Sequence, residues 1–177
     1  MTTNKYRAKK VYYDTSNRMM VSQAMIAGYR HQGKLKLPSD ILCFDSKFEF
    51  KVYRTLVDLF GSHAVICQYP IELIPSGQCY PSGKDWKIDF AIKPSLYAQE
   101  PSMLIEAKGV LTPGCISNLV TLELTHPEYF NALYLLFERA LPTKNRVIRR
   151  LLKTDFQHRI LLLEQFVERE VLQQAAI

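Results

Sequence analysis

The segments "WKIDFAI" (86–92) and "SMLIEAKG" (102–109) decide the predicted fold, because each carries charged residues inside an apolar run. The two-residue period of a strand puts Asp89 on one face of the first segment. The same period puts Glu106 and Lys108 together on one face of the second segment, about 6–7 Å apart. A charge inside an apolar run costs free energy unless it is paired, exposed or bound to a ligand. These three residues are therefore candidates for a functional site.

Two carboxylates and a lysine on one face of a sheet suit a metal-assisted reaction. If the two segments pair as a hairpin, Asp89 approaches Glu106, and two neighbouring carboxylates repel each other. A divalent cation relieves this repulsion, and Mg²⁺ is commonly held by one or two carboxylates with water and phosphate oxygens. Lys108 would then orient or deprotonate the attacking water, or stabilise developing charge. The alternative is a surface salt bridge on a half-exposed sheet, which is common and weak.

A third acidic residue, Glu49, lies in the segment 44–61, which has the apolar spacing of a helix that ends at Gly61. The helical period puts Glu49 beside the apolar face, so its carboxylate can reach a sheet packed against the helix. Ser46 and Glu49 also fit the S-x-x-E pattern of a capping box. The sequence leaves both roles of Glu49 open.

The rest of the chain alternates between periodic segments and turn-rich connections. Residues 1–38 are predicted to be a basic N-terminal extension with a helix over 15–29, and "LPSD" (37–40) begins the main domain, 39–177. The expected order of the main domain is helix, three strands, helix and a late element. The remaining elements are a strand over 64–74, a loop over 75–85, a connection over 94–101, a helix over 126–140, a basic amphipathic helix over 145–153, a strand or a helix over 158–166, and a frayed helical tail over 167–177.

The composition is that of a globular protein with an excess of positive charge. The 177 residues carry a net charge of +6, concentrated in 1–34 and 144–153, and both clusters suit a phosphate backbone. No apolar run approaches the roughly 20 residues that span a bilayer. The basic N-terminus lacks the apolar region of a secretory signal, so we expect a cytoplasmic location without membrane contact. The four cysteines lack zinc-ligand spacing and are expected to be reduced thiols.

The acidic residues, their spacing and the order of elements together resemble the PD-(D/E)XK nuclease superfamily. Glu49 on a helix is followed by Asp89, sixteen intervening residues, and then Glu106 and Lys108 as Glu-x-Lys. The stretches "FDSKFEF" and "CQYPIEL" are closest in pattern to the endonuclease subunit of heteromeric bacterial transposases and to small phage nucleases. Ile88 stands where the superfamily's name places proline.

This resemblance implies a restriction-endonuclease-like α/β fold with an αβββαβ core, in which helices flank a mixed central sheet. It implies Mg²⁺-dependent hydrolysis of DNA phosphodiester bonds, with Mn²⁺ as a substitute, in phage or mobile-element DNA processing such as transposition, resolution or restriction. Asp89, Glu106 and the carbonyl of Ala107 would bind the metal. Glu49 would support it directly or through water, and Lys108 would position the water or stabilise charge.

Contacts with DNA are expected at two kinds of residue. Gln68 is a candidate for the rim that faces the substrate. Basic residues would grip phosphates, which gives affinity with little sequence specificity; they are Lys9, Lys10, Lys144, Arg146, Arg149 and Arg150. Cutting two strands needs two sites, so a homodimer or a partner recombination or transposition protein is expected. The alternatives are an inactive nuclease-fold subunit that binds DNA or a partner, and a subunit active only within a larger assembly.

Overall fold

The computed structural model describes residues 9–31, 37–95 and 97–176. The chain separates into two compact units, Met1–Lys51 and Val52–Ile177. The first unit therefore extends beyond residue 38, where the sequence suggested that a basic extension ends. The basic residues Lys5, Arg7 and Lys34 of that segment lie outside the described residues.

The first unit contains a small antiparallel sheet with strand order β2-β1-β3. Asp14 accepts hydrogen bonds from the backbone and side-chain nitrogens of Asn17, which closes the turn between the first two strands. The helix predicted over 15–29 is therefore wrong in its first half, because residues 15–18 form a turn, and Met19 and Met20 belong to a strand. The elements are β1 (Val11–Asp14), β2 (Met19–Val21), α1 (Gln23–His31) and β3 (Ile41–Phe44).

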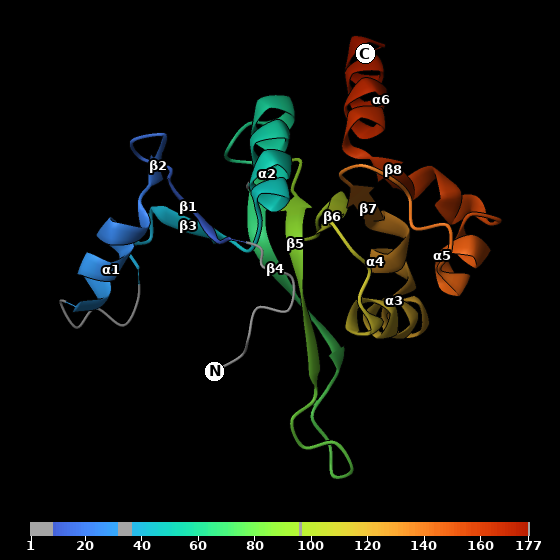
Figure 1. Cartoon of the computed structure of the whole chain (residues 1–177). Helices are drawn as coiled ribbons and strands as arrows, with labels where there is room; N and C mark the ends of the chain where they lie inside the picture. Colours follow the sequence, from blue (N-terminus) through green and yellow to red (C-terminus); the bar gives the residue numbers. More distant parts are fainter. Residues whose placement is uncertain (1–8, 32–36, 96, 177) are drawn as a thin grey trace. The chain divides into compact units, whose positions relative to one another are not determined.

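The second unit is built on a five-stranded mixed sheet whose strands lie in chain order (Figure 1). The first three strands pair antiparallel, and the last three pair parallel. The expectation of a mixed α/β fold with flanking helices is confirmed. The helix α2 (Lys47–Phe60) begins in the first unit and leads into the second. The strands are β4 (Val65–Ile74), β5 (Lys84–Ile92), β6 (Met103–Lys108), β7 (Leu133–Phe137) and β8 (Ile160–Leu162).

The connections between the parallel strands are helical, and the strand that follows the first of them corrects one prediction. The helix expected over 126–140 is wrong in its second half, where "LYLLF" forms β7; its leucines at 133, 135 and 136 are fully buried. A short apolar run fits a buried strand and a buried helix equally. The segment over 158–166 contains both alternatives, β8 and the start of α6. The helices are α3 (Pro113–Thr125), α4 (Pro127–Ala132), α5 (Arg146–Leu151), the 3₁₀ helix η1 (Asp155–Arg159) and α6 (Leu163–Ala175).

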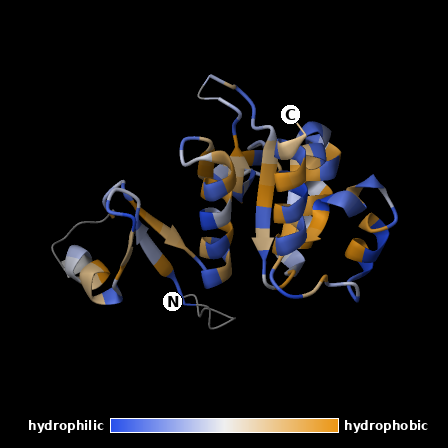
Figure 2. Ribbon diagram, turned by 90° about the horizontal axis from the view of Figure 1, so that it is seen from above, coloured by the Kyte–Doolittle hydropathy of each residue, from blue (hydrophilic) through white to orange (hydrophobic). Residues whose placement is uncertain are grey.

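Both faces of the central strands are covered. On one face, Leu104 and Leu135 belong to a core cluster with Leu119 of α3 and Ile148 of α5. On the other face, the ring of Phe90 lies 6.3 Å from that of Tyr53 in α2. Hydrophobic residues accordingly follow the strands of the sheet in Figure 2. No helix in the described ranges is long and apolar enough to cross a membrane.

The β4–β5 hairpin extends well beyond the rest of the second unit (Figure 1). The start of β5, beside the connecting loop, is held to α3, because the Nζ of Lys84 donates hydrogen bonds to the hydroxyls of Ser117 and Thr121. In the connecting loop, Gly83 has φ +61°, and a Cβ there would lie 2.9 Å from the carbonyl oxygen of Ile74. The loop therefore requires glycine at this position.

Candidate functional site

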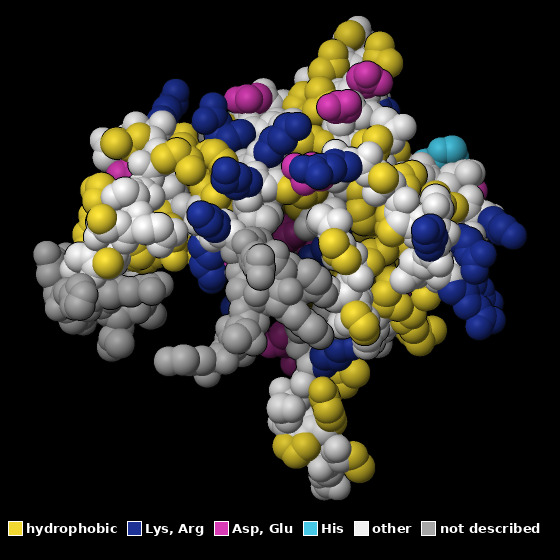
Figure 3. All heavy atoms as spheres, in the orientation of Figure 1, with side chains coloured by type: hydrophobic (Ala, Val, Ile, Leu, Met, Phe, Trp, Pro, Cys, Tyr) yellow, Lys and Arg dark blue, Asp and Glu magenta, His cyan; other side chains and the backbone are white. Residues whose placement is uncertain are grey.

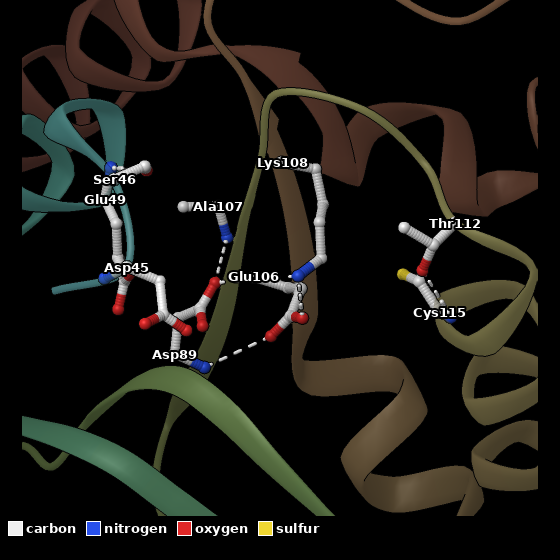
Figure 4. A network of polar contacts seen from close by, with 9 residues as sticks. All are labelled: Asp45, Ser46, Glu49, Asp89, Glu106, Ala107, Lys108, Thr112 and Cys115. Atoms are coloured by element: carbon white, nitrogen blue, oxygen red, sulfur yellow. Dashed lines mark hydrogen bonds and ion pairs between the residues drawn. The ribbon is translucent and has the colours of Figure 1, made fainter. Parts of the chain in front are cut away.

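Asp89 and Glu106 lie where β5 and β6 stop pairing. The regular ladder between these strands ends at Phe90 and Ile105. Beyond it, the backbone N–H of Asp89 donates to Glu106 Oε2 at 3.1 Å, and the backbone N–H of Ala107 donates to Asp89 Oδ2 at 2.9 Å. Each carboxylate thus binds the backbone of the opposite strand, which fixes both side chains at the fork (Figure 4).

Lys108 completes this group, which we call the carboxylate–lysine site (Asp89, Glu106 and Lys108). Its Nζ lies 2.5 Å from Glu106 Oε1 and 3.9 Å from Asp89 Oδ2. The side chain of Glu106 is only 3% exposed, and that of Lys108 is 22% exposed. The structure therefore brings together the three residues that the strand period had selected, inside the protein rather than as a surface salt bridge.

The electrostatics of the site keep Lys108 charged. Burial by itself would lower the pKa of Lys108, but the negative charges of Glu106 and Asp89 and the hydrogen bond to Glu106 raise it above its ordinary value. A lysine with a raised pKa holds its proton at neutral pH. In this arrangement Lys108 can orient water or stabilise negative charge, but it cannot accept a proton from water.

Cys115 of α3 is a neighbour of Lys108 that the sequence did not reveal. Thr112 caps α3, and its Oγ1 accepts a hydrogen bond from the backbone N–H of Cys115 at 3.2 Å. Burial raises the pKa of the Cys115 thiol to about 12, although the charge of Lys108 opposes the shift. The thiol is therefore neutral at physiological pH. The pair Thr112-Pro113, a cap followed by a first-turn proline, is the signal that could have located α3.

Glu49 has the capping role that its sequence allowed. The backbone N–H of Glu49 donates to Ser46 Oγ at 3.0 Å, and the backbone N–H of Asp45 donates to Glu49 Oε2 at 2.7 Å. The carboxylate thus reaches one residue before the cap, in a variant of the capping box. Glu49 belongs to the first unit and the carboxylate–lysine site to the second. Its role at a metal stays a prediction.

Gln68 lies on β4 across from Asp89, between the register pairs Cys67–Phe90 and Tyr69–Ile88. Its φ of +56° is in the left-handed region, which is uncommon for a residue with a side chain. Such backbone conformations concentrate at functional sites. The position agrees with the rim expected from the sequence, and contact with substrate stays a prediction.

The basic residues fall into two groups. In the first unit, Lys10 forms an ion pair with Asp45 at 3.2 Å, which raises the pKa of this lysine. In the second unit, the exposed cations of α5 follow β7, which is parallel to β6 and pairs Phe137 with Lys108. Because parallel strands end at one edge of a sheet, the segment that leads to α5 leaves from the edge where Lys108 lies.

Only a few oxygen ligands for a metal ion are present at the carboxylate–lysine site. The described part of the chain contains no group of three or more His, Cys, Asp or Glu side chains arranged to hold an ion. Asp89 and Glu106 supply two carboxylates, which suffices for Mg²⁺ when water and substrate phosphate oxygens complete the shell. The site therefore fits a magnesium ion that is shared with a substrate, and does not fit a closed structural metal.

Comparisons of the chain with protein-family models, with curated proteins and with solved structures found no match. The resemblance to PD-(D/E)XK nucleases thus depends on the motif residues and the order of elements. Function has to be argued from the chemistry of the carboxylate–lysine site.

Proposed function

We propose that this protein is a cytoplasmic, metal-dependent DNA endonuclease of the PD-(D/E)XK type. The observation that carries the proposal is the convergence of Asp89, Glu106 and Lys108 at the fork between β5 and β6. The order α2, β4, β5, β6, α3 and β7 supports it, because helix, three strands, helix and strand is the core order of that superfamily. The role in phage or mobile-element DNA processing is part of the same proposal.

Asp89 and Glu106 would hold Mg²⁺ or Mn²⁺, and the carbonyl of Ala107 would add a ligand. When bound, the metal would supply a Lewis acid for a phosphoryl oxygen and would lower the pKa of a bound water. Lys108 would act as a fixed cation that orients the attacking water and stabilises the negative charge of the transition state. The raised pKa of Lys108 shows that this lysine is a cation in the metal-free protein.

Lys108 also offsets part of the negative charge of the carboxylates in the metal-free protein. Its ammonium is close to Glu106 Oε1, so a divalent cation would compete with it for this oxygen. The ion pair thus offsets one of the two carboxylate charges until a metal and a substrate are present. The same ion pair favours a second candidate function, a nuclease-fold subunit that binds DNA or a partner without catalysis, because Glu106 already has a cationic partner without a metal.

The first experiment is a cleavage assay on plasmid, linear and branched DNA with and without Mg²⁺ or Mn²⁺. The variant is Asp89→Asn, and its matched control is Asp85→Asn, an exposed aspartate on the same strand. Metal-dependent cleavage that is lost only in the Asp89 variant supports the nuclease. Absence of cleavage on every substrate with intact DNA binding favours the second candidate. Because cleavage of both DNA strands needs two cuts, the oligomeric state of the protein should be measured in the presence of DNA.

A further inference from the structure

The helix α5 presents all of its cationic side chains on one side. Arg146, Arg149, Arg150 and Lys153 follow the spacing i, i+3, i+4 and i+7, and we call them the α5 stripe. The helical turn continues to Lys153, whose backbone N–H donates to the carbonyl of Arg150. All four residues are exposed, whereas Ile148 is fully buried in the core. The core packing of α5 therefore holds the stripe toward solvent.

The α5 stripe lines a surface hollow of about 460 Å³, to which Thr143 and Leu152 also contribute. Among the described residues, no acidic side chain lines this hollow. Within the described ranges, none of the four cationic groups forms an ion pair or a hydrogen bond with another side chain. Figure 3 shows Lys and Arg side chains gathered over this region of the molecule.

This arrangement is unfavourable for the protein on its own. Like charges three and four residues apart on a helix repel each other. Two lysines elsewhere in this unit do have partners: Lys84 binds two hydroxyls, and Lys93 binds the carbonyl of Gln99. Uncompensated charge of one sign in a concave surface attracts a counter-ion of the opposite sign. The α5 stripe is therefore suited to an anionic ligand.

We propose that the α5 stripe binds successive phosphates of a DNA backbone, at a site separate from the carboxylate–lysine site. From Arg146 to Lys153 the helical rise covers about 10 Å, which matches about three phosphates at about 3.4 Å of axis each along one strand. Three of the four cations are arginines, whose planar guanidinium groups bind phosphate oxygens in pairs. The choice of DNA among polyanions rests on the proposed function. Such contacts give affinity and orientation without reading bases.

The test is the binding of a fluorescently labelled DNA duplex to the full chain in EDTA, over a series of salt concentrations. The variant is Arg149→Gln with Arg150→Gln, since glutamine keeps the helix propensity. The control, Arg54→Gln with Lys93→Gln, removes the same charge elsewhere. We expect the stripe variant to bind about tenfold or more weakly near physiological salt and to lower the salt slope by about 2. The control should retain the binding of the unmodified protein.

Further binding measurements distinguish the ways in which the proposal could be wrong. Equal binding by the stripe variant and the control would overturn the proposal, as would equal competition by polyglutamate and by unlabelled duplex at matched charge. The proposal would also be overturned if millimolar inorganic phosphate displaced the duplex more than chloride does at equal ionic strength. The hollow would then bind a single phosphate rather than a DNA backbone. A lysine variant, Arg149→Lys with Arg150→Lys, should restore binding, which excludes misfolding as the cause.

The same proteins are then tested for metal-dependent hydrolysis of bis(p-nitrophenyl) phosphate, a diester too small to reach both sites. The stripe variant should hydrolyse it like the unmodified protein, whereas Asp89→Asn should not. If the unmodified protein fails to hydrolyse any diester, the proposed function fails, but the binding result still decides the role of the α5 stripe. Loss of small-diester hydrolysis in the folded stripe variant would contradict separate sites.

Discussion

The carboxylate–lysine site and the α5 stripe handle charge in opposite ways. At the first, Asp89, Glu106 and Lys108 are largely buried, and each charge has a partner within hydrogen-bond or ion-pair distance. At the second, four exposed cations share a hollow without a side-chain partner in the described part of the chain. Buried charges need compensation within the protein, whereas exposed charges can await an external ligand. The contrast separates a site suited to chemistry from a surface suited to binding.

The largest expected effect concerns thiol reactivity, which reports burial beside Lys108. Cys115 should react with iodoacetamide at pH 8 about 10³-fold more slowly than the exposed Cys79, because its pKa of about 12 leaves little thiolate. Its rate should rise about tenfold per pH unit up to about pH 10. Mass spectrometry of alkylated peptides gives both rates. Equal rates for Cys115 and Cys79 in the folded protein would contradict the buried site. In denaturant, the two cysteines should react at equal rates.

The second effect is on the free energy of unfolding. Glu106→Ala leaves Lys108 without its closest partner and opens a cavity, so we expect a loss of about 3 kcal/mol. Arg149→Gln on the α5 stripe should change the free energy of unfolding by less than about 0.5 kcal/mol. Urea denaturation at pH 7 measures both. A similar loss of unfolding free energy in the two variants would contradict the contrast between the paired charges of the carboxylate–lysine site and the unpaired charges of the α5 stripe.

The strand pattern correctly predicted that Asp89, Glu106 and Lys108 lie together. The spacing of apolar residues gave wrong predictions for some neighbouring elements. Period-two alternation in 86–92 and 102–109 was enough to bring Asp89 toward Glu106. It was not enough to predict that the ladder ends there, because the crossed bonds between carboxylates and opposite backbones depend on how the strands diverge. The alternation also fails at Ala91, which is buried with Trp86 and Ile88 in one core cluster.

The missed and mistaken elements have a common physical cause. β7 was assigned to a helix because a five-residue apolar run covered on both sides has no diagnostic period. α3 was missed although Thr112 and Pro113 mark its start. The dual character of Glu49 could not be resolved from the sequence, since a capping carboxylate and a ligand carboxylate have the same pattern. All four residues of the α5 stripe belong to the basic cluster 144–153 that is visible in the sequence, and the structure added Thr143 and Leu152 to the lining of the hollow.

The third effect separates metal binding from catalysis. Lys108→Met removes the cation that competes for Glu106, so Mn²⁺ should bind roughly tenfold more tightly while cleavage is lost. Titration calorimetry measures the affinity, and the cleavage assay measures the activity. Weaker Mn²⁺ binding in this variant would mean that Lys108 supports the metal rather than competing with it.

The smallest effect addresses Glu49. Glu49→Gln keeps an oxygen that can accept from the backbone of Asp45, so the free energy of unfolding should change by less than about 0.5 kcal/mol. If Glu49 also supports the metal, as the resemblance implies, cleavage should fall several-fold at unchanged stability. Ser46→Ala is the control, because it should cost about 1 kcal/mol of stability through the cap alone. Unchanged cleavage by a stable Glu49→Gln protein would leave this residue only its capping role.

The most direct test of the central claim is metal-dependent DNA cleavage by the unmodified protein, Asp89→Asn and Asp85→Asn, measured side by side. Both substitutions remove one carboxylate charge from β5, and only Asp89 binds the backbone at the fork with β6. We predict cleavage with Mg²⁺ or Mn²⁺ by the unmodified protein and by Asp85→Asn, and none by Asp89→Asn. Cleavage by Asp89→Asn equal to that of the control would contradict the assignment of the carboxylate–lysine site.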